Sequence, residues 1–144
     1  MAIEPRKLKR MLELKKRIEL AKKGEVASAR SELDEAQLGL MRAQAEQRQR
    51  VDDLQNAGEV SATELADRAR FVVDAGNQVG KARNVVVQRD REFMAREQAR
   101  MIATRDVKTF ETLNERARDE QRATQRKLEQ AAADEVASTR WSKA

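Results

Sequence analysis

Two runs of residues recur every seven positions along this chain, and each run matches the other when one is read backwards. The first consists of Val26, Leu33, Leu40, Gln47 and Leu54, and the second of Leu65, Val72, Val79, Val86 and Phe93. If the chain folds back at residues 58–60, each residue of the first run meets one of the second, and every pair of numbers adds to 119. A constant sum is required of two antiparallel helices, and a seven-residue apolar period is typical of a coiled coil. The sequence therefore predicts an all-α fold, a long antiparallel coiled-coil hairpin.

The composition supports a coiled coil over a globular domain. Charged residues make up 38% of the chain and aromatic residues only 3%, so a wide apolar core cannot form. So charged a chain could also be disordered, but two matching apolar runs would not then be expected.

Local signals place the ends of the two helices. Pro5 suits the first turn of a helix, Gly58 suits a helix end with a left-handed backbone, and Ser61 with Glu64 forms a capping box. A single domain over 1–144 is predicted, with a first helix over about 5–57, a turn at 58–60 and a second helix over 61–142.

The seam, meaning the line of residues along which the helices pack, is predicted to change phase near the start of the first helix. Leu14, Ile18 and Ala21 would carry it there, whereas Val26 and its successors carry it later. Such a stutter locally unwinds a coiled coil. In the same register Ile18 would face Met101 and Leu12 would face Val107, and both pairs of numbers add to 119.

The second helix is predicted to be the longer one. In the 119 register Arg6 lies opposite Leu113, so the second helix would be unpaired beyond about residue 113. This overhang contains few large apolar residues and should be weakly stable alone, because long helices depend on packing.

The net charge of +5 is concentrated near the start, where residues 6–23 hold nine basic and two acidic side chains. Such a patch can meet nucleic acid, anionic lipid or an acidic protein surface. It lacks interleaved aromatic residues and any nucleic-acid reading motif, so we expect no nucleic-acid partner. No apolar run approaches bilayer length and no signal peptide is evident, which predicts a cytoplasmic protein without direct membrane insertion.

Catalysis has little support in the sequence. The chain has no His and no Cys, which removes the commonest general base, nucleophile and metal ligands. Carboxylate pairs such as Asp52 with Asp53 are read as solvated helix faces. We therefore predict no enzyme activity, no catalytic or metal-binding residues and no cofactor.

Three stretches carry a resemblance to a known family. They lie at 12–17 (LELKKR), 99–116 (ARMIATRDVKTFETLNER) and 129–137 (EQAAADEVA), and the matching positions are Lys108, Leu113, Glu115, Arg116, Asp134 and Glu135. Over essentially its whole length the chain resembles the central stalk proteins of type III export. These are the FliJ family of the flagellum and its injectisome relatives SctO and YscO, and the sequence leaves open which system applies.

The resemblance implies a non-enzymatic stalk that is similar to the two-helix part of a rotary ATPase gamma subunit. Both chain ends would insert into the pore of the hexameric export ATPase, and the turn would contact the cytoplasmic domain of the membrane export gate. Export chaperones are further implied partners. The free protein would be a monomer, held at the cytoplasmic face of the inner membrane through its partners.

Candidate contact residues follow from the resemblance. Those for the ATPase are basic residues near the two chain ends: Lys7, Arg10, Lys15, Lys16, Arg17, Arg116, Arg118, Arg122, Arg126 and Lys127. Those for the export gate lie near the turn: Gln44, Gln47, Arg48, Val51, Phe71 and Val73. The turn region is poor in aromatic residues, which leaves Phe71 as the main large apolar contact expected there.

Two other functions compete with the stalk. A generic coiled-coil scaffold or adaptor would pair its arms between chains or self-associate through the overhang. A basic nucleic-acid-binding coiled coil would use the face within residues 6–23 and bind any duplex with a steep salt dependence.

Overall fold

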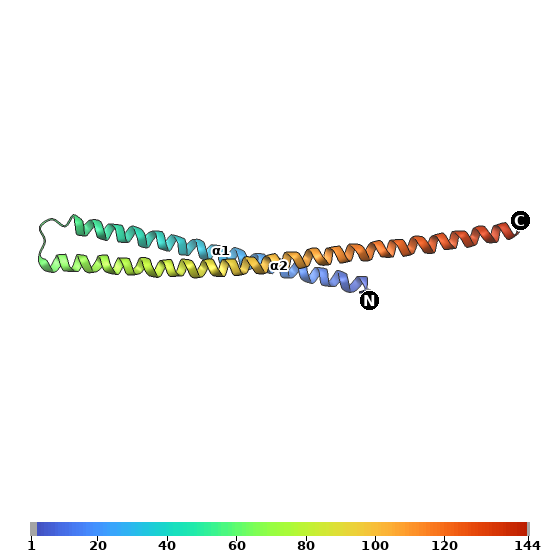
Figure 1. Cartoon of the computed structure of the whole chain (residues 1–144), viewed down its shortest axis with the longest axis horizontal. Helices are drawn as coiled ribbons and strands as arrows, with labels where there is room; N and C mark the ends of the chain where they lie inside the picture. The colour runs from blue at the N-terminus through green and yellow to red at the C-terminus, as the bar shows by residue number, and fades with distance from the viewer. Residues whose placement is uncertain (1–2, 144) are drawn as a thin grey trace. The chain divides into compact units, whose positions relative to one another are not determined.

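The computed structural model describes residues 3–143 and contains two helices (Figure 1). Helix α1 spans Pro5–Gln55 and helix α2 spans Ala62–Lys143. No strand occurs in the described part of the chain. The predicted all-α helical hairpin is confirmed.

The chain divides into two compact units, which are described separately. The turn unit is Lys22–Arg100 and contains the loop between the helices. The terminal unit combines Met1–Ala21 with Met101–Ala144.

Local hydrogen bonds define the turn. The Asn56 N–H donates to the Asp52 carbonyl at 2.9 Å, which extends the last turn of α1. Gly58 follows with a φ of 62°, a left-handed conformation that glycine adopts at little cost. The Glu64 N–H then donates to the Ser61 hydroxyl at 3.1 Å, which satisfies one of the free donors at the start of α2. The chain between the helices therefore spans 56–61.

Small and medium apolar residues form the core of the turn unit. Ala29 and Leu33 of α1 and Ala75 and Val79 of α2 are buried. The alanines allow the helix backbones to approach closely, because interaxial distance depends on the side chains at the contact.

Ion pairs beside this core join the two arms of the turn unit. Arg89 lies 3.4 Å from Glu32, and Arg96 lies 3.5 Å from Glu25. In both pairs the residue numbers add to 121, so the two pairs share one antiparallel register.

The core of the terminal unit consists of Leu8 and Leu12 from α1 with Ala103 and Val107 from α2. Leu12 and Val107 were predicted to face one another, and both are buried.

The predicted phase change at the start of α1 is wrong. Leu14, Ile18 and Ala21 are exposed, whereas Lys15 and Glu19 are half-buried. The buried stripe thus keeps its spacing of three and four residues from Leu8 onward. Long charged side chains can occupy such positions because their aliphatic stems cover the apolar seam while their charged ends reach solvent.

The predicted contact of Ile18 with Met101 fails for the same reason. Met101 is also exposed, at 49%. Once the seam keeps its phase, both residues fall outside it.

Beyond the core of the terminal unit α2 continues as a single exposed helix. Asn114 and Ala117 are half-buried, and every residue from 118 to 143 is exposed. At about 1.5 Å per residue this exposed segment extends for about 40 Å. No helix in the described part is both long and apolar enough to cross a membrane.

Candidate protein-binding surfaces

Basic side chains of α1 in the terminal unit fall on two faces. Lys7, Arg10 and Arg17 are exposed and separated by three and seven residues, a spacing that places them on one side of a helix. Lys16 is also exposed, but it directly precedes Arg17 and therefore points about 100° away from it. A partner on one side of α1 would contact the first three residues together.

Lys15 differs from the other predicted basic contacts because it is engaged within the hairpin. Its ammonium group lies 3.7 Å from the Asp106 carboxylate and 5.8 Å from the centre of the Phe110 ring. About a third of the side chain remains exposed. The ion pair and the cation–π contact indicate that Lys15 joins α1 to α2.

The predicted basic residues of α2 form a stripe and a separate pair. Arg118, Arg122 and Arg126 are spaced four residues apart and so share one face, whereas Arg116 and Lys127 lie on another. All five are exposed. Arg122 approaches Asp119 at 3.9 Å, a surface contact that contributes little to stability.

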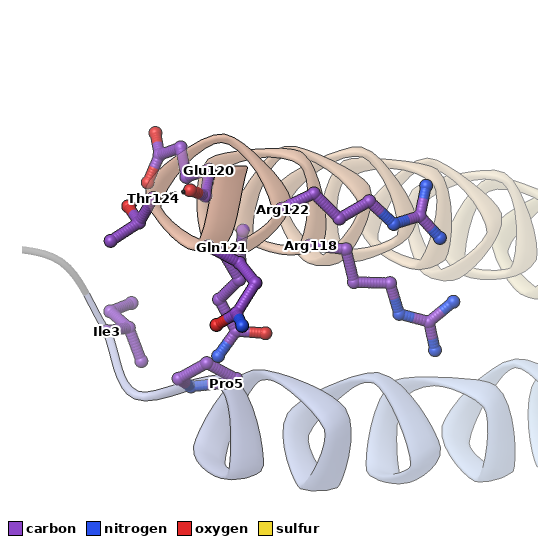
Figure 2. Close-up of a pocket in the computed structure, with 9 residues that line it drawn as sticks. Ile3, Pro5, Arg118, Glu120, Gln121, Arg122 and Thr124 are labelled. Atoms are coloured by element: carbon purple, nitrogen blue, oxygen red, sulfur yellow. Dashed lines mark hydrogen bonds between the residues drawn. The ribbon is translucent and has the colours of Figure 1, made fainter. Parts of the chain in front are cut away.

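The start of α1 lies against α2 where the exposed segment begins. Ile3 and Pro5 line a surface hollow with Gln121 and Thr124, and the Arg118 and Arg122 side chains extend in a common direction beside it (Figure 2). Gln121 and Thr124 were not predicted as contact residues. Only their spacing could have predicted them. Gln121 and Thr124 continue the half-buried series of Asn114 and Ala117 at intervals of four and three residues.

The predicted gate-binding residues near the turn are only partly available. Arg48, Phe71 and Val73 are exposed, whereas Gln44, Gln47 and Val51 are half-buried. The Gln47 Nε2 atom lies 3.6 Å from the place where a Cβ atom at position 76 would stand, so Gln47 packs over Gly76.

Phe71 belongs to a side-chain cluster that the sequence analysis missed. The Arg50 guanidinium lies 5.1 Å from the centre of the Phe71 ring, and Arg68 donates to the Asp53 carbonyl at 2.9 Å. These four residues line a second hollow. Only the helix register could have predicted this cluster. The numbers of Arg50 and Phe71, and those of Asp53 and Arg68, add to 121, as they do in the ion pairs of the turn unit.

Two ion-pair groups have shifted pKa values. A hydrogen bond to Glu92, together with the charges of Glu92 and Glu32, raises the pKa of Arg89. A hydrogen bond from Arg100 lowers the pKa of Glu97. Both shifts favour the charged forms at neutral pH, as expected of ion pairs that hold helices rather than of groups that exchange protons.

Comparison with known protein families identifies a match over nearly the whole chain. The family model described as flagellar FliJ protein matches residues 5–144. No curated protein and no solved structure matches the chain.

Proposed function

Because the chain belongs to the FliJ family of flagellar proteins, we propose that it is the non-enzymatic central stalk of a flagellar type III export apparatus. In this proposal its two ends insert into the hexameric export ATPase and its turn reaches the membrane export gate. The stalk would thus couple ATP hydrolysis to the gate while performing no chemistry itself.

The observation that supports the ATPase contact most is the exposed end of α2. A single helix without lateral contacts is marginally stable in water, and a surrounding ring would supply the missing packing. The exposed residues from 118 to 143 also carry the stripe of Arg118, Arg122 and Arg126. Exposed ion pairs are individually worth less than about 1 kcal/mol, so such contacts could break and re-form as a ring changes conformation.

The proposed ATPase contacts are exposed basic residues of the terminal unit. They are Lys7, Arg10, Lys16, Arg17, Arg116, Arg118, Arg122, Arg126 and Lys127. Lys15 is left out because it already pairs with Asp106.

The proposed gate contacts lie near the turn, on the exposed residues Arg48, Phe71 and Val73. Gln44, Gln47 and Val51 are half-buried, so they would support this surface rather than supply most of its contacts. The cation–π contact of Arg50 with the Phe71 ring would favour one orientation of this exposed aromatic residue.

The test uses the export ATPase of the same organism. ATP hydrolysis and hexamer formation are measured with the full chain, with a variant that ends at Ala117, and with an Arg118→Gln, Arg122→Gln, Arg126→Gln variant. We expect the full chain to stimulate hydrolysis and both variants to lose most of that stimulation. A matched control, Arg42→Gln with Lys81→Gln and Arg83→Gln, removes the same charge from exposed sites in the turn unit.

Two results would count against the stalk. The first is equal stimulation by the full chain and the variant ending at Ala117. The second is self-association of the free chain through α2, measured by sedimentation. It would favour a scaffold, for which the exposed Leu128, Val136 and Trp141 are the relevant observation.

A further inference from the structure

Apolar side chains gather on the outside of the terminal unit. We name this surface the terminal face and define it by Met11, Leu14 and Ile18 of α1 with Ile102 and Leu113 of α2. Their exposed fractions run from 36% to 56%.

The Lys15–Asp106 ion pair places the two halves of the terminal face on one side of the hairpin. Met11 and Ile18 lie one turn before and after Lys15, and Ile102 lies one turn before Asp106. The two charged groups approach to 3.7 Å, so the surfaces around them are adjacent. Leu113 lies two turns beyond Asp106 and extends the same stripe of α2.

The terminal face gives α1 a second apolar stripe. Leu8 and Leu12 already bury one side of the helix against α2. Met11, Leu14 and Ile18 repeat at the same spacing of three and four residues on another side. A helix that is apolar on two sides is expected where it packs against two neighbours, and α2 supplies only one.

Basic residues border the terminal face. Lys7 and Arg10 lie one turn before Met11 and Leu14, and Arg17 lies three residues after Leu14. On α2, Arg105 and Arg116 each lie three residues after an apolar member of the face. All five basic residues are exposed.

Acidic residues are few on this side. Asp106 is neutralised by Lys15 within the face. Glu4 lies two turns before Met11, and Glu120 lies two turns after Leu113, so both are beyond the ends of the face. The sides of the face are therefore positively charged along its length.

We propose that the terminal face binds an amphipathic helix of a partner protein, whose apolar stripe is flanked by acidic residues. Apolar side chains of the partner would pack on the terminal face, and the acidic flanks would meet Lys7, Arg10 and Arg17 on one side and Arg105 and Arg116 on the other. A second copy of this chain fits poorly, because its own basic border would oppose this one. The proposal shares Lys7, Arg10, Arg17 and Arg116 with the proposed ATPase contacts, but the apolar residues that define the face belong to neither set of proposed stalk contacts, and the proposal does not depend on the stalk function.

The test measures binding of a designed peptide probe to the full chain by fluorescence anisotropy. The probe is a labelled helix of five turns with Leu and Ile on its seam and Glu on both flanks. A matched probe carries Lys on the flanks instead. We expect the acidic probe to bind and the basic probe not to bind.

Variants locate the binding to the terminal face. Leu14→Gln is expected to weaken binding at least about tenfold, because it would bury a polar group at the centre of the interface, where the costliest substitutions lie. Leu20→Gln is the matched control, because Leu20 is 71% exposed on the opposite side of α1 and should leave the affinity unchanged. Arg10→Gln with Arg17→Gln should weaken binding severalfold and reduce its salt dependence.

Four outcomes would overturn the proposal. They are absence of acidic-probe binding, equal binding of both probes, dissociation of a chain dimer by Leu14→Gln in sedimentation, and Leu14-dependent binding to phosphatidylglycerol vesicles without probe binding. The last two would assign the terminal face to a second copy or to a membrane. Because Leu14 is more than half exposed, its replacement should preserve the fold, which circular dichroism of both Gln variants checks.

Discussion

A single leucine in a core only two helices wide has few neighbours that could compensate for its loss. Leu33 is 4% exposed and packs in a core that also contains Ala29, Ala75 and Val79. Since alanine contributes little apolar area, Leu33 and Val79 are the larger of these four buried side chains. The free-energy cost of truncating Leu33 should therefore be close to that of truncating a deeply buried leucine in a globular protein.

We expect Leu33→Ala to lower the free energy of unfolding by about 2–4 kcal/mol, through lost burial and the cavity left behind. The matched control is Leu38→Ala, because Leu38 is exposed on the same helix and its truncation should change the stability by no more than about 0.5 kcal/mol. Urea denaturation followed by circular dichroism gives both values. Equal losses for the two variants would mean that Leu33 does not lie in the core.

Residue identity misled the sequence analysis at one place, the start of α1. Apolar character favoured Leu14 and Ile18 for the seam, but Lys15 and Glu19 are the half-buried residues. The register of α1 is set by the long run of seam positions after Val26. A helix keeps its periodicity more readily than it unwinds. Continuing the same register toward the chain end therefore places Lys15 and Glu19 at seam positions. Leu14 and Ile18 lie instead on the terminal face. That surface could not be predicted, because both residues were expected in the seam.

At the scale of the elements, turn chemistry was the most predictable feature. Gly58, Ser61 and Glu64 act through bonds to residues close in sequence, so a short motif contains all the information needed. Helix pairing was predictable for a different reason, because a repeated seam on two arms allows only a few registers. The contacts of Arg50 with Phe71 and of Arg68 with Asp53 required that register to be known first.

The same substitution at two glycines should have opposite effects on stability. Gly58→Ala places a side chain at a φ of 62°, which should cost about 1–2 kcal/mol of stability although no neighbouring atom lies within 4 Å. Gly39→Ala, in the middle of α1 and equally free of neighbours, should gain up to about 1 kcal/mol because alanine favours the helix. Thermal and urea unfolding of the two variants would measure this. A gain at position 58 would contradict the left-handed turn.

For the whole molecule, the core and the exposed end of α2 should respond differently to truncation. The buried residues of both units lie at or before Val107, and none lies within 118–143. A chain ending at Ala117 should therefore keep its urea unfolding midpoint, while its total helical signal in circular dichroism falls. A large drop in the midpoint would show that the exposed segment stabilises the hairpin in solution.

How much of the proposed binding surfaces could be predicted also depends on scale. The basic residues of both ends could be found from the sequence, because charge clusters need no structure to be recognised. Which of them share a face required the helical spacing, and which are already paired, such as Lys15, required the contacts between the arms. The family match adds the setting of the protein, the flagellar export apparatus, but assigns none of these residues to a partner.

The exposed end of α2 also bears on how many copies of the protein persist in a cell. Helical segments without tertiary contacts open with little free energy, and proteases cleave where opening is most frequent. In copies that have found no partner, residues 118–143 would be degraded first, whereas copies enclosed by a partner would be shielded. Surplus molecules would thus lose this segment, and the supply of intact chains would follow the number of assembly sites.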